Sequence, residues 1–193
     1  MKFLNKLTMV LAKITEIVLW VGIAVAIGAI IVSVIDFNAI TNFMTESEFL
    51  ENGGLSGYGL DVNALSADGE INRYAVIIYF VGAILSFGLM AMVFRNVYLI
   101  MKKLNGKNNE IVSPFHKDII RMTKEIGIFT IAVPVVCFIL SIIATAISLA
   151  NGLATEITVN ISTETVMIAL ISFCLTNVFT YGASLEKDVD GLV

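Results

Sequence analysis

The chain has 193 residues, of which 58% are hydrophobic and only 15% are charged, and its mean hydropathy is +0.91. Soluble domains are about 25% charged on average, so this composition excludes an ordinary soluble globular protein. The formal net charge of -4 hides an uneven distribution, because the acidic residues gather mainly in one loop and the basic residues in other segments.

Four apolar runs account for the hydrophobic excess, and each is close to the length of about 20 residues that spans a bilayer core. They predict spans at residues 14–35, 74–94 (with an amphipathic extension to 103), 127–150 and 164–181. Little other chain remains, so we expect residues 1–193 to form a single membrane domain. The fold class is then an all-α integral membrane protein, a four-transmembrane-helix bundle.

The basic residues lie almost entirely on one side of the predicted spans. That side carries Lys2, Lys6, Lys13, Arg95, the six bases of residues 102–126, and Lys187. The other side carries only Arg73. Because lysine and arginine are retained on the cytoplasmic face of a membrane, both termini are predicted to be cytoplasmic. The first run is too long for a signal peptide, so we expect an uncleaved span.

The two external loops, residues 36–73 and 151–163, carry weak structural signals. An apolar side within residues 37–50 suggests a short amphipathic helix. Residues 60–65 and 157–161 alternate between apolar and polar, which is typical of strands and could pair them in a small extracytoplasmic β/loop cap. The acidic side chains of the first loop match no calcium-loop spacing, so we interpret the loop as solvated.

A cationic hinge, residues 102–126, separates the second and third spans and holds half of the 12 bases and the only histidine. Ser113-Pro114 predicts a helix start, with serine as the cap and proline at the first helical position. An amphipathic helix is therefore expected at 114–126. Its apolar face recurs at Phe115, Ile119, Met122 and Ile126.

The basic side chains of this hinge lie on the other faces of the expected helix, where they could bind anionic lipid headgroups or a soluble partner. The candidate partner- or lipid-binding residues are Lys102, Lys103, Lys107, Phe115, Lys117, Arg121 and Lys124. We do not predict direct binding of nucleic acid, because anionic lipid lies beside the same charges and competes for them.

Three residues of the spans are singled out by their chemistry. Arg95 lies near the cytoplasmic end of the second span, where an ionisable group is either functional or extends toward the headgroups. Pro134 predicts a kink in the third span. Asn177 lies toward the inner end of the fourth span. Cys137 and Cys174 are predicted near mid-membrane as packing residues rather than as a metal or redox pair.

Two short motifs complete the pattern: Ser113-Pro114-Phe115, leading to Ile126-Gly127, and an ending from Phe179 through Gly182-Ala183 to Glu186. Together with four spans and a long first external loop, they resemble a family of small bacterial membrane proteins filed as domain of unknown function 2975. The resemblance implies a bacterial inner-membrane protein, often encoded beside a small helix-turn-helix regulator. The family has no established chemistry, so no catalytic residue is carried over.

Three classes of function remain to be weighed. An enzyme is not expected, because the only histidine lies in the hinge and no nucleophile, metal-ligand or phosphate-loop pattern is present; neither a metal nor a cofactor is predicted. We expect a regulatory or sensory membrane protein that docks a soluble partner, such as a small helix-turn-helix regulator, on its hinge and its polar tail, residues 181–193. The alternative is a small oligomeric transporter or channel, or an immunity or resistance protein.

Overall fold

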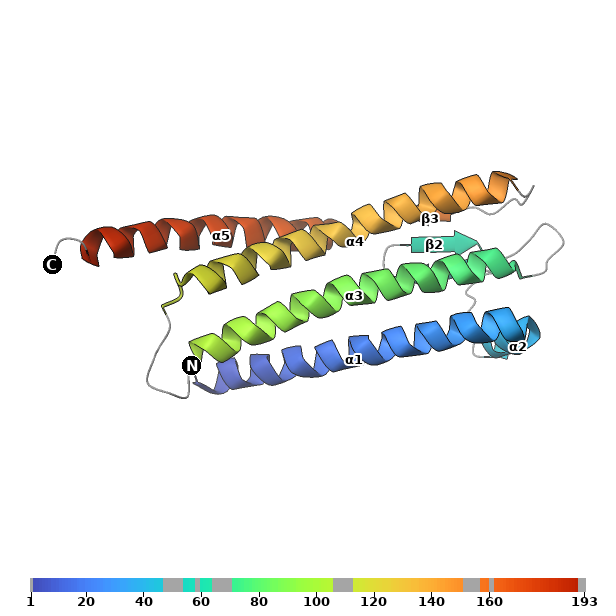
Figure 1. Cartoon of the computed structure of the whole chain (residues 1–193), viewed down its shortest axis with the longest axis horizontal. Helices are drawn as coiled ribbons and strands as arrows, with labels where there is room; N and C mark the ends of the chain where they lie inside the picture. Colours follow the sequence, from blue (N-terminus) through green and yellow to red (C-terminus); the bar gives the residue numbers. More distant parts are fainter. Residues whose placement is uncertain are drawn as a thin grey trace. The chain divides into compact units, whose positions relative to one another are not determined.

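The computed structural model describes residues 2–46, 54–57, 60–63, 71–105, 113–150, 157–159 and 162–190. Within this part of the chain, four helices are long and apolar enough to cross a membrane (Figure 1). They are α1 (Lys2–Ile35), α3 (Arg73–Leu104), α4 (Lys117–Ala150) and α5 (Thr163–Asp190). The predicted helical class, with four helices capable of spanning a membrane, is therefore confirmed.

These helices are longer than the predicted spans. At 1.5 Å per residue, the 34 residues of α1 extend about 51 Å, whereas a bilayer core is about 30 Å thick. The extra turns lie at the charged ends: α1 begins at Lys2 rather than at residue 14, and α5 continues to Asp190 rather than ending at 181. Residues 182–190 were predicted as part of a polar tail after the fourth span. They continue α5 instead, because residues such as Ala183, Leu185, Glu186 and Lys187 are good helix formers.

The hinge differs most from expectation. Residues 117–126 of the helix predicted at 114–126 are helical, but they do not form a separate helix, because α4 runs without a break from Lys117 to Ala150. Ser113, Pro114 and Phe115 instead make a turn before it, in which the His116 N–H donates to the Ser113 carbonyl at 3.0 Å. His116 is the cap residue, since its carbonyl accepts from the Ile120 N–H at 3.2 Å. Pro134 lies inside α4, which continues through it as one helix.

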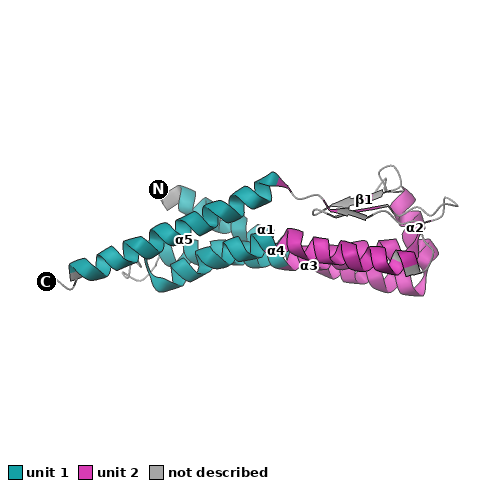
Figure 2. Ribbon diagram, turned by 90° about the horizontal axis from the view of Figure 1, so that it is seen from above, with its two compact units in different colours: residues 1–19, 89–131, 163–193 teal, residues 20–88, 132–162 magenta. Residues whose placement is uncertain are grey.

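The described chain divides into two compact units (Figure 2). Unit 1 consists of Met1–Leu19, Leu89–Ile131 and Thr163–Val193, and therefore contains all of α5 with the basic ends of the other three long helices. Unit 2 consists of Trp20–Gly88 and Ala132–Ser162. The division follows the chemistry, since α3 carries Arg95, Lys102 and Lys103 in unit 1 and no charge between residues 74 and 88 in unit 2.

Unit 2 includes the short helix α2 (Phe37–Glu46), which confirms the amphipathic helix expected in this loop. Asp36 separates it from α1: its N–H donates to the Val32 carbonyl at 2.8 Å, and its side chain accepts from the Ala39 N–H at 3.2 Å. One aspartate thus ends the first helix and caps the second.

A three-stranded antiparallel sheet completes unit 2, formed by β1 (Gly54–Gly57), β2 (Leu60–Asn63) and β3 (Ile157–Val159) in the order β1-β2-β3. The expected pairing of the two loops is observed, because β2 pairs with β3. Its position outside a membrane stays a prediction.

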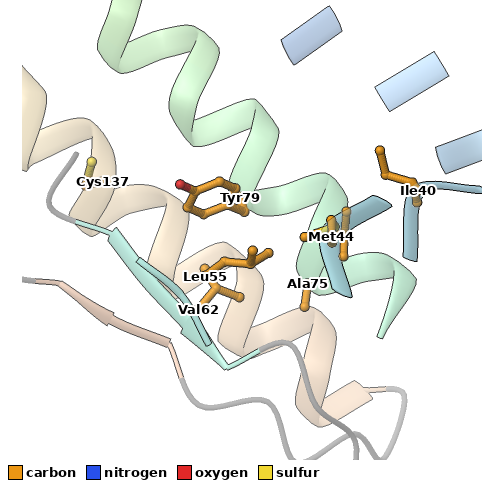
Figure 3. Close-up of a cluster of buried hydrophobic side chains, with 8 residues drawn as sticks. Ile40, Met44, Leu55, Val62, Ala75, Tyr79 and Cys137 are labelled. Atoms are coloured by element: carbon orange, nitrogen blue, oxygen red, sulfur yellow. The ribbon is translucent and has the colours of Figure 1, made fainter. Parts of the chain in front are cut away.

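The sheet buries one face against the helices of unit 2 (Figure 3). Leu55 and Val62 are direct partners across β1 and β2, and both side chains are fully buried. Tyr79 of α3 and Cys137 of α4 belong to the same cluster. Cys137 also lies 3.6 Å from the Ser86 hydroxyl, so this thiol is a packing and hydrogen-bonding group, as its apolar setting predicts.

Candidate functional site

The turn before α4 is fixed to α5 at the basic end of unit 1. The Ser113 hydroxyl donates to a Glu186 carboxylate oxygen at 3.0 Å, and the same hydroxyl oxygen accepts from the Phe115 N–H at 3.2 Å. Proline at position 114 fixes its own φ angle and so reduces the number of backbone conformations open to the turn. Ser113 therefore links the turn to α5 while it also stabilises the turn itself.

Phe115 forms the apolar half of this link. Its ring packs on Gly182 of α5, where no side chain could be accommodated without displacing the ring. The ring also meets Phe179, one turn earlier on α5, edge to face with a centroid distance of 6.3 Å. We call Ser113, Phe115, Phe179, Gly182 and Glu186 the clamp.

A second glycine contact lies further along the same pair of helices. A Cβ on Gly127 of α4 would lie 2.8 Å from the Phe173 ring of α5. The two sequence motifs that carry the family resemblance thus contribute to one interface, although they are separated by more than 50 residues. The sequence did not predict this contact, because the contact depends on how α4 and α5 pack together and neither segment alone specifies that packing.

The clamp ends where an exposed basic face of α4 begins. Lys117, Arg121 and Lys124 are all exposed, and their i, i+4, i+7 spacing places them on one face of the helix. Among the described residues, Lys117 and Lys124 make no ion pair, and Arg121 makes only a loose one, at 3.6 Å to Glu125. Lys102, at the end of α3, is exposed as well. We call Lys117, Arg121 and Lys124 the basic face.

Two of the predicted binding residues serve the fold itself. Lys103 of α3 forms a salt bridge with Asp118 in the first turn of α4, and both side chains are partly exposed. Phe115 belongs to the clamp. Asp118 was not singled out from the sequence; the only available signal was an acid within a basic segment, which favours a local ion pair. Lys107 lies outside the described residues.

A further polar contact joins α3 and α4 about two turns from the Lys103–Asp118 salt bridge, toward the apolar part of each helix. The side-chain amide of Asn96, which is buried, donates to one oxygen of Glu125 at 3.1 Å, and the other oxygen of Glu125 faces Arg121. Arg95 is exposed beside this group and makes no ion pair within the described part of the chain. Arg95 was identified from the sequence, whereas Asn96 was not, because its partner Glu125 lies 29 residues away on another helix and nothing in the local sequence connects the two.

Glu16, the one acidic residue of the first predicted span, forms a salt bridge within α1. Glu16 is buried in α1 and accepts from Lys13 at 2.9 Å. The same ammonium lies 5.2 Å from the centroid of the Tyr98 ring of α3. This local pair gives Glu16 a structural role. Asn177 is exposed on α5.

No three histidine, cysteine or carboxylate side chains among the described residues come together in a way that could hold a metal ion. The chemistry of this end of unit 1 is therefore that of a charged surface beside a set of interhelical contacts. No family model, no curated protein sequence and no solved structure matches this chain. The likeness to the bacterial family described above stays a prediction from the residues themselves.

Proposed function

We propose that this protein is a non-enzymatic regulatory or sensory protein of a bacterial inner membrane, and that its basic face docks an acidic surface of a soluble cytoplasmic partner. In this proposal both termini are cytoplasmic and the β1-β2-β3 sheet is an extracytoplasmic cap. The resemblance suggests the class of partner, a small helix-turn-helix regulator.

The exposed basic face is the observation that carries this proposal. Three cations lie on one side of α4 within two turns, and two of them have no internal carboxylate partner among the described residues. A row of unpaired charges on a helix attracts a surface of opposite sign, and complementary charge gives such docking its selectivity. Lys103 and Phe115 are removed from the docking surface, since both are used within the protein.

The clamp supports the same reading. It fixes the turn that precedes α4 to α5 through a hydrogen bond and an aromatic contact, so the helix that carries the basic face begins at an anchored point. A preorganised surface loses less conformational freedom on binding than a loose one. A signal that moved α5 could then change the position of the basic face, which is how a sensory membrane protein would release or capture a regulator.

Capture of a partner from the native host tests this proposal. The tagged full-length protein is purified in mild detergent, and co-purifying soluble proteins are compared for the wild type, Lys117→Glu and Lys124→Glu. Both side chains are exposed and make no ion pair or side-chain hydrogen bond among the described residues, so the protein should fold normally. Lys6→Glu is the matched control, because it makes the same charge change at an exposed position of α1.

We expect one soluble protein to be retained by the wild type and by Lys6→Glu and to be lost from both α4 variants. Equal capture by all four proteins would refute docking on the basic face. If none captures a soluble protein, the oligomeric transporter or channel becomes the better reading, and ion flux in proteoliposomes is the next measurement.

A further inference from the structure

A cavity of about 270 Å³ lies between α3 and α4 within unit 1, at the end of the apolar part of each helix. Its polar wall consists of Arg95 and Asn96 from α3 with Arg121 and Glu125 from α4. It is open on one side, and it differs from the apolar contacts of unit 2 because two guanidinium groups border it.

The charges around this cavity do not cancel. Glu125 is the only carboxylate of its lining, and both of its oxygens are engaged, one by Asn96 at 3.1 Å and one by Arg121 at 3.6 Å. Arg95 has no carboxylate within ion-pair distance among the described residues. The lining therefore carries two positive charges and one negative charge, so an anion is the ligand that its electrostatics favour.

The position of the cavity along the helices narrows the class of anion. Arg95 is the first charged residue of α3 after its apolar stretch, and Glu125 is the last charged residue of α4 before its apolar stretch. Met92 and Phe129, on the apolar side of these two residues, belong to the same lining. Leu99, which follows Arg95 on α3, and Met122, which follows Arg121 on α4, also line the cavity. A ligand that fills it thus meets the two guanidinium groups together with apolar side chains, and Met92 and Phe129 continue the apolar lining toward the apolar stretches of the two helices.

We propose that this cavity binds the phosphate of an anionic phospholipid, with Arg95 as the main contact, Arg121 as the second, and the start of an acyl chain against Met92 and Phe129. Guanidinium groups bind phosphate oxygens through paired, charge-assisted hydrogen bonds. When the helices span a bilayer, the junction between apolar and charged sequence lies at the depth of the headgroups. The proposal depends on this orientation, but it does not depend on docking of a soluble partner.

Binding of short-chain lipids to the purified full-length protein tests the proposal. Dioctanoyl phosphatidylglycerol, dioctanoyl phosphatidylcholine and chain-free glycerol phosphate are each titrated, and ligand-dependent thermal stabilisation gives the apparent affinity. The first lipid carries both the anionic phosphate and the chains, the second cancels the headgroup charge, and the third removes the chains. The variants are Arg95→Gln, Arg95→Lys and Arg121→Gln, with Lys6→Gln as a control of equal charge change.

We expect phosphatidylglycerol to bind the wild type and Lys6→Gln equally, and to bind about tenfold more tightly than either other ligand. Arg95→Gln should weaken its binding by about tenfold, and Arg121→Gln by less, because Arg121 is shared with Glu125. Arg95→Lys keeps the charge without the paired donors, and its intermediate affinity would show that the site, rather than the fold, has changed.

Three results would overturn the proposal. Equal binding of phosphatidylcholine would show that the chains alone are recognised, and equal binding of glycerol phosphate would make this a site for a soluble anion. Equal losses in Arg95→Gln and Lys6→Gln would indicate a diffuse charge effect. Lys117 does not line this cavity, so Lys117→Glu tests docking of a soluble partner without removing a contact of the lipid site. Failure of lipid binding and failure of docking are therefore separate outcomes.

Discussion

Gly182 of α5 lies directly against the ring of Phe115, so closely that a Cβ atom at this position would overlap the ring. The same ring packs edge to face with Phe179, so a displacement of the ring would also disturb this aromatic contact. Glycine is required here because the Phe115 ring, from the turn before α4, lies directly on α5, and not because of an unusual backbone conformation.

Substitution of this glycine should therefore destabilise the protein. Gly182→Ala and Gly127→Ala each force an aromatic ring to move, at a cost of about 1–3 kcal/mol in the free energy of unfolding. Gly28→Ala is the matched control, since a Cβ there meets no atom within 4 Å. Thermal unfolding in detergent, followed by circular dichroism, measures the difference. Equal stability of Gly182→Ala and Gly28→Ala would contradict the clamp.

The bond between Ser113 and Glu186 should appear as a coupling energy. In a double-mutant cycle with Ser113→Ala and Glu186→Ala, we expect about 0.5–1 kcal/mol, because the bond is charge-assisted but exposed. Ser113→Ala alone should cost more than Glu186→Ala alone, since the hydroxyl also accepts from the Phe115 N–H. Additive single effects would show that the bond contributes nothing to stability.

Removal of the Glu125 carboxylate should expose the cost of an unpaired buried amide. Glu125→Ala takes away the acceptor of Asn96, which is only 7% exposed, and should destabilise the protein by about 1–3 kcal/mol. Glu125→Gln retains an acceptor oxygen in the same place and should cost about 1 kcal/mol or less. Chemical unfolding of the two variants side by side gives the comparison, and equal losses would argue against this hydrogen bond.

The orientation in the membrane can be measured with single cysteines. In a background where Cys137 and Cys174 are replaced by alanine, Lys6→Cys should react with a membrane-impermeant maleimide only in inverted vesicles. Ser162→Cys should react only in intact cells. Lys6 lies at the start of the first predicted span, on the cytoplasmic side, whereas Ser162 follows three spans and therefore lies on the opposite side. Both positions are exposed, so access does not limit the reaction. The reverse pattern would invert the topology inferred from the basic residues.

Some of this structure follows from local sequence. The four long helices follow from the length of each apolar run, and α2 and the pairing of β2 with β3 follow from short periodic patterns. The helix ends were predicted less well. The apolar runs mark where lipid is required, but a helix continues past that boundary wherever its side chains still favour it, as α5 does to Asp190.

The candidate site was predicted only as a group of charges. Lys117, Arg121 and Lys124 were identified as a basic surface, and their exposure agrees with that description. Lys103 and Phe115 were grouped with them as candidate binding residues, yet they contact Asp118 and Gly182. The identity of a basic or aromatic residue does not show whether its side chain faces solvent or contacts another helix.

What the sequence alone determined, then, is the membrane class, the number of long apolar helices and the side on which the bases gather, since each depends on residues close together in the chain. Only the tertiary structure decided which distant residues meet: Ser113 with Glu186, Phe115 with Gly182, and Asn96 with Glu125. The physical reason is that hydropathy and charge are summed along a segment, whereas a hydrogen bond or a close packing contact depends on the register between helices, which no single segment contains.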